Sequence, residues 1–228
     1  MKSYTTLLLD LDGTLFDFGS TERIALKKLL NHIRLEMDEE KKEIYHRVNM
    51  LCWQDYENGI ITMERLKTRR FEEFLKELGL KLDAQELSDL FIEYLSKEGI
   101  LIDGALDLIK KLKERYKLVI VTNGIASVQR GRLDVSNTTN YFDAIVISEE
   151  IGYQKPDVRF FEKALEIANA KKEECLIIGD GLSSDIKGGR DSEIDTLYLH
   201  LDTPCLASSD MYTYEAGSYA EILSLLYF

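Results

Sequence analysis

Two carboxylates stand at the end of an apolar run near the start of the chain. Asp10 and Asp12 follow three leucines, residues 7–9, with a further leucine between them. Such a run is typical of a strand buried on both faces, and residues two apart on a strand project to the same side. Ionised carboxylates beside an apolar strand are costly unless a cation or hydrogen-bond donors compensate them. The pair therefore predicts a binding site where this strand ends.

A second apolar run, KLVIVT, ends in Thr122 and continues into Asn123 and Gly124. We expect a helix to begin here, with the backbone N–H groups of Asn123 and Gly124 free to bind an anion, because helix N-termini carry unpaired N–H groups. Lys155, farther along the chain, adds a positive charge. A threonine, two backbone amides and a lysine together suit a phosphoryl group.

A further run, CLIIG, leads to Asp180, and Asp185 lies five residues later. The carboxyl ends of parallel strands lie along one edge of a sheet, so these acids can converge with Asp10 and Asp12. Several carboxylates together suit a hard, oxygen-seeking cation such as Mg²⁺, which keeps some of its water. The sequence thus predicts a Mg²⁺ site beside the site for a phosphoryl group.

The order of the predicted elements favours such a sheet. From Ile102 onward, apolar strands alternate with amphipathic helices, and repeated β-α-β units form a parallel sheet between helices. Before that point, apolar stripes at helical spacing predict four helices, which bury these stripes by packing against one another. We therefore predict an α/β fold: a Rossmann-like, doubly wound parallel sheet in residues 1–15 and 100–228, with an inserted helical domain in residues 16–99.

Composition narrows the class of protein. The formal net charge of −12 argues against a surface that binds a nucleic-acid polymer, and no apolar stretch is long enough for a membrane span. Three widely spaced cysteines, without a C-x-x-C pair, are expected to be reduced thiols in a cytoplasmic protein. The three histidines, His32, His46 and His200, show no metal-ligand spacing, so surface or packing roles are expected.

Four motifs resemble those of the haloacid dehalogenase-like phosphohydrolase superfamily, and the match spans essentially the whole chain. They are Asp10-Leu11-Asp12-Gly13-Thr14, Thr122-Asn123-Gly124, Lys155-Pro156, and Gly179-Asp180 through Asp185. The helical insertion lies where that superfamily carries a helical cap domain. The resemblance implies a Mg²⁺-dependent hydrolase of a small phosphorylated metabolite.

The resemblance also implies a role for each motif residue. Asp10 would be the nucleophile that forms an aspartyl-phosphate, and Asp12 would be the general acid–base. Thr122 and Lys155 would hold the phosphoryl oxygens. Mg²⁺ would be bound by Asp10, the backbone carbonyl of Asp12 and Asp180, with Asp185 in support.

Within the superfamily, the chain resembles pyrimidine 5′-nucleotidase-like phosphatases. The stretches WQDYENG (residues 53–59) and VISEEIG (residues 146–152) carry that likeness, together with Arg69-Arg70-Phe71. It implies a nucleoside 5′-monophosphate as substrate, with Trp53 or Tyr56 stacking on the base and Arg70 orienting the substrate. Packing of Trp53 between helices of the insertion is the alternative.

Other substrates and activities stay open at this point. A sugar-phosphate or phosphoglycolate phosphatase, or a phosphosugar mutase, would share the four motifs. A dehalogenase is disfavoured because that branch lacks the second acid, here Asp12. A phospho-receiver domain also uses an aspartyl-phosphate, a threonine and a lysine, but it is about half this length and lacks a helical insertion. The oligomeric state is not fixed by the sequence.

Overall fold

The structure contains a six-stranded, all-parallel sheet. The computed structural model describes residues 2–201, 204–205 and 207–227. Within these residues the strand order is β3-β2-β1-β4-β5-β6, which confirms the predicted fold class. The strands are β1 (Thr6–Leu9), β2 (Lys117–Thr122), β3 (Ala144–Ile147), β4 (Cys175–Gly179), β5 (Asp195–Leu199) and β6 (Tyr214–Ala216). For the last strand, the sequence predicts a position near Met211 to Tyr214, and the structure shows it slightly later in the chain.

Strand β1 lies at the point where the order of the strands reverses. It pairs with β2 on one side and with β4 on the other, so Leu9 stands between Ile120 and Ile178. In open parallel sheets, ligands bind at the carboxyl ends of the strands on either side of such a switch point. Asp10 and Asp180 directly follow the two strands that flank it.

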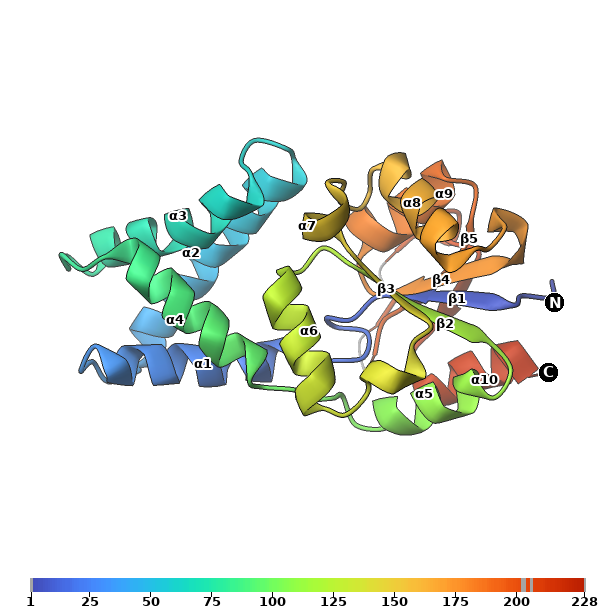
Figure 1. Cartoon of the computed structure of the whole chain (residues 1–228), viewed down its shortest axis with the longest axis horizontal. Helices are drawn as coiled ribbons and strands as arrows, with labels where there is room; N and C mark the ends of the chain where they lie inside the picture. The colour runs from blue at the N-terminus through green and yellow to red at the C-terminus, as the bar shows by residue number, and fades with distance from the viewer. Residues whose placement is uncertain (1, 202–203, 206, 228) are drawn as a thin grey trace. The chain divides into compact units, whose positions relative to one another are not determined.

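Helices cover both faces of the sheet, which explains why its strands read as continuous apolar runs. Figure 1 shows α5 (Ala105–Lys113) and α10 (Tyr219–Tyr227) on one face, and α8 (Val158–Ala168) and α9 (Lys187–Asp191) on the other. All residues of β1 and β4 are buried. On the α8 side, Leu8, Val121 and Ile177 belong to one cluster with Phe160 and Phe161.

Short helical segments complete this unit around the carboxyl edge of the sheet and in its connections. They are η1 (Thr139–Tyr141), α7 (Ser148–Ile151), η2 (Lys172–Glu174) and the π-helical turn η3 (Leu182–Ile186). The turn η3 runs directly into α9, so the chain that follows Asp180 is helical almost at once.

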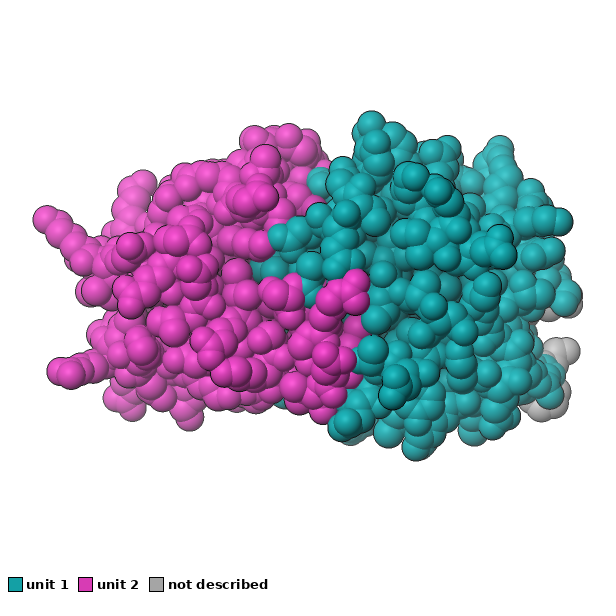
Figure 2. All heavy atoms as spheres, viewed as in Figure 1, with its two compact units in different colours: residues 1–18, 100–126, 136–228 teal, residues 19–99, 127–135 magenta. Residues whose placement is uncertain are grey.

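The chain divides into two compact units, coloured separately in Figure 2: residues 1–18, 100–126 and 136–228 form the first, and residues 19–99 and 127–135 form the second. We call them the core unit and the helical unit. The helices of the second are α1 (Phe18–His32), α2 (Glu39–Glu57), α3 (Met63–Glu77), α4 (Ala84–Ser96) and α6 (Ala126–Val135).

Caps and an aromatic cluster stabilise the helical unit. The side chains of Asp38, Thr62 and Asp83 each accept a hydrogen bond from a backbone N–H in the first turn of the following helix. Tyr45, Phe71, Phe74 and Phe91 are fully buried and lie at ring-centroid distances of 5.3–5.9 Å in the described contacts.

Helix α6 falls in the helical unit although the sequence assigns its residues to the sheet domain. A Cβ atom on Gly131 would lie 2.6 Å from the carbonyl oxygen of Ser96, at the end of α4. Glycine therefore permits α6 and α4 to approach at backbone distance, and residues 127–135 pack with the helical unit.

Among the described residues, no helix is both long enough and apolar enough to span a membrane.

Candidate active site

Three carboxylates meet at the carboxyl edge of the sheet. Asp10, Asp180 and Asp185 each bring an oxygen atom within 4.8 Å of the others. Asp10 follows β1 and continues its ladder, because its backbone N–H donates to the carbonyl of Ile178 at 3.0 Å. Asp185 lies in the π-helical turn after β4. The structure therefore brings together three of the four acids that the sequence places at this edge.

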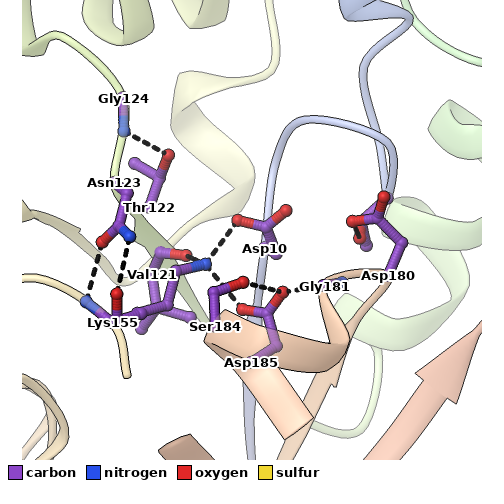
Figure 3. Close-up of polar contacts among 11 residues, drawn as sticks. Asp10, Val121, Thr122, Asn123, Gly124, Lys155, Asp180, Gly181, Ser184 and Asp185 are labelled. Atoms are coloured by element: carbon purple, nitrogen blue, oxygen red, sulfur yellow. Dashed lines mark hydrogen bonds and ion pairs between the residues drawn. The ribbon is translucent and has the colours of Figure 1, made fainter. Parts of the chain in front are cut away.

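Lys155 lies between two of these acids (Figure 3). Its Nζ donates to Asp10 Oδ1 and to Asp185 Oδ1, each at 2.6 Å, and to the carbonyl of Val121 at 2.9 Å. An ammonium group has three N–H donors, so these three bonds use all of them. Lys155 therefore holds the Asp10 carboxylate in a fixed orientation and links it to strand β2.

Negative charge exceeds positive charge in this buried group. Burial raises the pKa of Asp10 well above its usual range, and the neighbouring charges of Asp185 and Asp180 add to the effect, while Lys155 opposes it. Burial alone would lower the pKa of Lys155, but the carboxylates of Asp10 and Asp185 outweigh it and raise that pKa. Lys155 thus stays charged, and one ammonium is shared among three acids.

Asp180 lies against the turn that follows Asp10. The Thr14 hydroxyl donates to Asp180 Oδ1 at 3.3 Å, and a Cβ atom on Gly13 would lie only 2.2 Å from Asp180 Oδ2. Gly13 has a φ of +81°, which also favours glycine. Burial of its carboxyl group and the charge of Asp185 raise the pKa of Asp180 to about 6, although the residue keeps an exposed side.

Asp185 is the most firmly held of the three acids. Its Oδ2 accepts from the backbone N–H of Gly181 at 3.1 Å and from the Ser184 hydroxyl at 3.4 Å, while its Oδ1 accepts from Lys155. A Cβ on Gly179 would lie 2.5 Å from the Asp185 carboxyl carbon, so the strand and the turn approach closely. Ser184 and Thr14 were given no role from the sequence, since hydroxyl residues beside a turn are common.

The loop after β2 differs in one respect from its prediction. The Gly124 backbone N–H is not free, because it donates to the Thr122 hydroxyl oxygen at 3.1 Å. The next helix start is also occupied, since the Ala126 N–H donates to Glu149 Oε2 at 2.7 Å. Local bonds of this kind compete for the N–H groups of a helix start. The Gly124 N–H thus has a partner within the loop, and its contact with an anion stays a prediction.

Asn123 has a contact that the sequence did not indicate. Its side-chain Nδ2 donates to the Lys155 carbonyl at 2.9 Å, and its Oδ1 accepts from the Lys155 backbone N–H at 2.8 Å (Figure 3). The amide thus binds both backbone groups of the residue that carries the ammonium. Asn123 is a positioning residue for Lys155.

Asp12 lies in the turn after β1 and is half-buried, with its backbone bridged to that of Phe16. Its carboxylate is not part of the group formed by Asp10, Asp180 and Asp185. The proposed metal contact of Asp12 uses the backbone carbonyl instead, and that contact stays a prediction.

The three residues proposed to contact the substrate lie in the helical unit. Trp53 and Tyr56 are neighbours on α2, with ring centroids 5.8 Å apart in an edge-on arrangement; Trp53 is half-buried and Tyr56 is buried. Arg70 is only 1% exposed, packs against the rings of Phe71 and Phe91, and donates to Asn49 Oδ1 at 3.3 Å. This position favours a packing role for Arg70.

The donor set suits a hard divalent cation. Asp10, Asp180 and Asp185 supply oxygen atoms only, and Lys155 is the one cation bonded to them in the part of the chain that the structure describes. Three carboxylates with one bonded ammonium leave an excess of negative charge when all three acids are ionised. Oxygen ligands with unbalanced charge are the environment that Mg²⁺ prefers in proteins.

A parallel α/β sheet with three acids and a lysine at its switch point forms a polar site where open α/β sheets bind their ligands. Comparison with known protein families shows that the sequence model of the haloacid dehalogenase-like hydrolases matches residues 4–192. The chain belongs to this family.

Two relatives from bacteria match nearly the whole chain. Pyrimidine 5′-nucleotidase PynA of Streptococcus pneumoniae is 38% identical over 98% of this chain and 95% of its own length. HAD-hydrolase YfnB of Bacillus subtilis is 36% identical over 99% of this chain and 97% of its own length. The crystal structure of YfnB, described as bound to magnesium, superposes with a TM-score of 0.91 and covers 100% of both chains.

A third relative carries the same activity in its name. Pyrimidine 5′-nucleotidase YjjG of Escherichia coli is 33% identical, with 85% of each chain covered. The family and these relatives identify the chain as an enzyme of the hydrolase class.

Proposed function

We propose that this enzyme is a Mg²⁺-dependent phosphatase that hydrolyses nucleoside 5′-monophosphates through an aspartyl-phosphate. The observation that carries the proposal is the Asp10 carboxylate, buried and held at 2.6 Å by Lys155 among two further acids. Two relatives named as pyrimidine 5′-nucleotidases support the substrate class.

The orientation of Asp10 suits a nucleophile. Lys155 bonds one carboxylate oxygen and so prevents rotation of the group, which places it for attack on phosphorus. The P–O bond to the leaving group breaks as the bond from Asp10 forms, and water then cleaves the acyl phosphate. When bound, Mg²⁺ would be held by Asp10, Asp180 and the carbonyl of Asp12, where it would neutralise charge on the phosphoryl oxygens.

The remaining residues serve proton transfer and positioning. Asp12 gives a proton to the leaving oxygen and later takes one from water. The Thr122 hydroxyl, at the carboxyl end of β2, donates to a phosphoryl oxygen, and the bond that it accepts from the Gly124 N–H does not use its O–H. Asp185 keeps Lys155 in place from the opposite side.

The test is release of inorganic phosphate from a panel of phosphomonoesters in the presence of Mg²⁺. The panel contains purine and pyrimidine nucleoside 5′-monophosphates, sugar phosphates and phosphoglycolate. We expect the highest kcat/KM for a nucleoside monophosphate, and no turnover for Asp10→Asn, because an amide does not attack phosphorus. Substantial activity of Asp10→Asn would disprove the covalent route, and a preference for sugar phosphates or phosphoglycolate would disprove the substrate class.

A further inference from the structure

A second set of metal-binding side chains lies in the core unit, and its members differ from those of the acid group. His200, Cys205 and Glu215 each bring a ligand atom within 4.8 Å of the others. His200 directly follows β5, Glu215 lies in β6, and Cys205 lies in the connection between these strands. The sequence did not indicate this group, because its spacing matches no familiar metal motif and only the pairing of β5 with β6 closes it.

The register of two strands places His200 and Glu215 on the same side of the sheet. Tyr198 of β5 pairs with Glu215 of β6, and His200 lies two residues after Tyr198 along the chain. Paired residues and residues two apart project to one face. The His200 backbone N–H also donates to the Ala216 carbonyl at 3.0 Å, and its ring lies 5.5 Å from that of Tyr198. Glu215 therefore lies within a strand, and His200 is held beside it by a backbone hydrogen bond to that strand.

Cys205 comes to these two residues from the connection and contacts Tyr212. Its Sγ lies 3.6 Å from the Tyr212 hydroxyl, which in turn donates to Glu215 Oε2. The carboxylate of Glu215 thus has a hydrogen-bond partner that orients it, as the carboxylate ligands of metal sites usually have. Cys205 and His200 are half-buried and Glu215 is exposed, so an ion from solvent can reach all three.

We propose that His200, Cys205 and Glu215 form a site for Zn²⁺ or a similar transition-metal ion, separate in composition from the Mg²⁺ site. Imidazole nitrogen, thiolate sulfur and carboxylate oxygen are the three ligand types that zinc uses in proteins. Three protein ligands leave the fourth tetrahedral position to water. The thiol of Cys205 releases its proton to solvent as the bond from sulfur to the metal forms.

The distances permit this site with a small adjustment. In a tetrahedral site with bonds of about 2.0–2.3 Å, the ligand atoms lie about 3.5 Å from one another. Here they lie within 4.8 Å, and Cys205 belongs to a connection rather than to a strand. Closing the group requires a shift of about 1 Å, which rotation of the Cys205 and Glu215 side chains can supply. The ion would fasten the connection between β5 and β6 to both strands.

The experiment separates the two metal sites by ligand chemistry. Protein stripped of metal is kept in excess Mg²⁺, which occupies oxygen ligands but competes weakly for sulfur and nitrogen. It is then titrated with Co²⁺, because a bond from cobalt to thiolate gives a charge-transfer absorption that no oxygen site produces. We expect this absorption to saturate at one equivalent, and Zn²⁺ to abolish it, since zinc binds such sites more tightly than cobalt.

Variants identify the ligands. Cys205→Ser should lose the charge-transfer band, and His200→Ala and Glu215→Gln should weaken Co²⁺ binding about tenfold or more. Cys52→Ser and His46→Ala are matched controls: Cys52 is a buried thiol of α2, His46 is an exposed imidazole of the same helix, and both variants should keep the band. Melting curves establish that each variant is folded.

A wild-type protein without the band, or a folded Cys205→Ser variant that retains it, would overturn the proposal. A band that survives both His200→Ala and Glu215→Gln unchanged would also do so, because it would show cobalt bound to the thiol alone. In that event, the hydrogen bonds through Tyr212 account for the clustering of Cys205 and Glu215.

Discussion

At the scale of single residues, Lys155 is the buried ammonium that pairs with two carboxylates. It is 3% exposed, and its side chain pairs with Asp10 and Asp185, which are buried as well. Removing one partner from a buried ion pair leaves uncompensated charge, which is far more harmful than losing an exposed pair. The stability of the core unit and the orientation of the Asp10 carboxylate therefore depend on the same side chain.

Lys155→Met should lower the free energy of unfolding by about 3 kcal/mol or more, because two buried carboxylates lose their partner. Lys163→Met is the matched control, since Lys163 forms an exposed pair with Glu166 at 2.6 Å, and its loss should cost about 0.5 kcal/mol or less. Urea denaturation without metal measures both. Equal changes in the two variants would contradict this account of Lys155.

Asp12→Asn should lose about 10²-fold or more in kcat on nucleoside monophosphates, the usual scale of general acid–base catalysis. Its loss should be smaller in the first step with an aryl phosphate that has an acidic phenol, because that leaving group needs little protonation. Rapid mixing should then show a burst of phenol followed by slow turnover, whereas Asp10→Asn should show no burst. A similar loss in the first step on both substrates would argue against a general acid at Asp12.

The sequence could predict which residues gather at the sheet edge but not how they bond. Three of these residues stand at the ends of apolar runs that the sequence identifies as strands: Asp10, Thr122 and Asp180. Lys155 is recognised because it precedes Pro156. The rules of β-α-β connection then bring the ends of these strands to one edge of the sheet. That all three donors of Lys155 are used, or that the Gly124 N–H is taken by Thr122, depends on side-chain rotamers. Arg70 shows the same limit, since the sequence suggests a contact with substrate and cannot show that the rings of Phe71 and Phe91 enclose the guanidinium.

At the scale of elements, the predicted helices and strands agree with the structure where the pattern is long and periodic. Asn137 has a φ of +56° just beyond α6, as expected for a left-handed helix stop. Glu193 follows α9 and adopts a φ of +58°, in the left-handed region that favours glycine. The turn after α9 therefore places a glutamate in the left-handed conformation, which is unfavourable for a residue with a Cβ atom. The sequence alone could not show that Glu193 adopts this conformation.

Helix α2 offers a test of substrate recognition. If Trp53 stacks on a base, Trp53→Ala should lose about 1–3 kcal/mol of binding, which corresponds to about tenfold or more in KM for nucleotides. Hydrolysis of a minimal aryl phosphate should stay nearly unchanged. Leu51→Ala is the control on the same helix, because Leu51 is an exposed apolar residue. Equal losses on both substrates with a lowered Tm would show that Trp53 is a packing residue.

At the scale of the whole molecule, pH and metal should act together on stability. The pKa of Asp180 is raised to about 6 in the folded protein, above its ordinary value of 3.8. The folded state therefore holds this proton more tightly, and the resulting stability is complete below about pH 4 and is lost as the pH rises through about 6. Mg²⁺ bound at the proposed site would favour the charged carboxylate and offset this loss.

The difference in Tm with and without Mg²⁺ should consequently widen as the pH rises from about 5 to about 8. Calorimetry at matched ionic strength is required, because a chain with a formal net charge of −12 is stabilised by salt in general. Asp180→Asn should remove much of the pH dependence of that difference. If the Tm difference stays constant across this pH range, Mg²⁺ binding does not depend on ionisation of the Asp180 carboxyl.

The paired bonds of the Asn123 amide have a consequence for tolerance to insertions and deletions. Thr122 pairs with Ile147 in the sheet. The side chain of the next residue, Asn123, bonds the backbone N–H and carbonyl of Lys155 and so fixes the position of Lys155 relative to β2. The position of the ammonium is thus independent of the length of chain between β3 and Lys155. We therefore expect that inserting or deleting one residue within 152–154 leaves the lysine in place, provided that the amide at position 123 is kept.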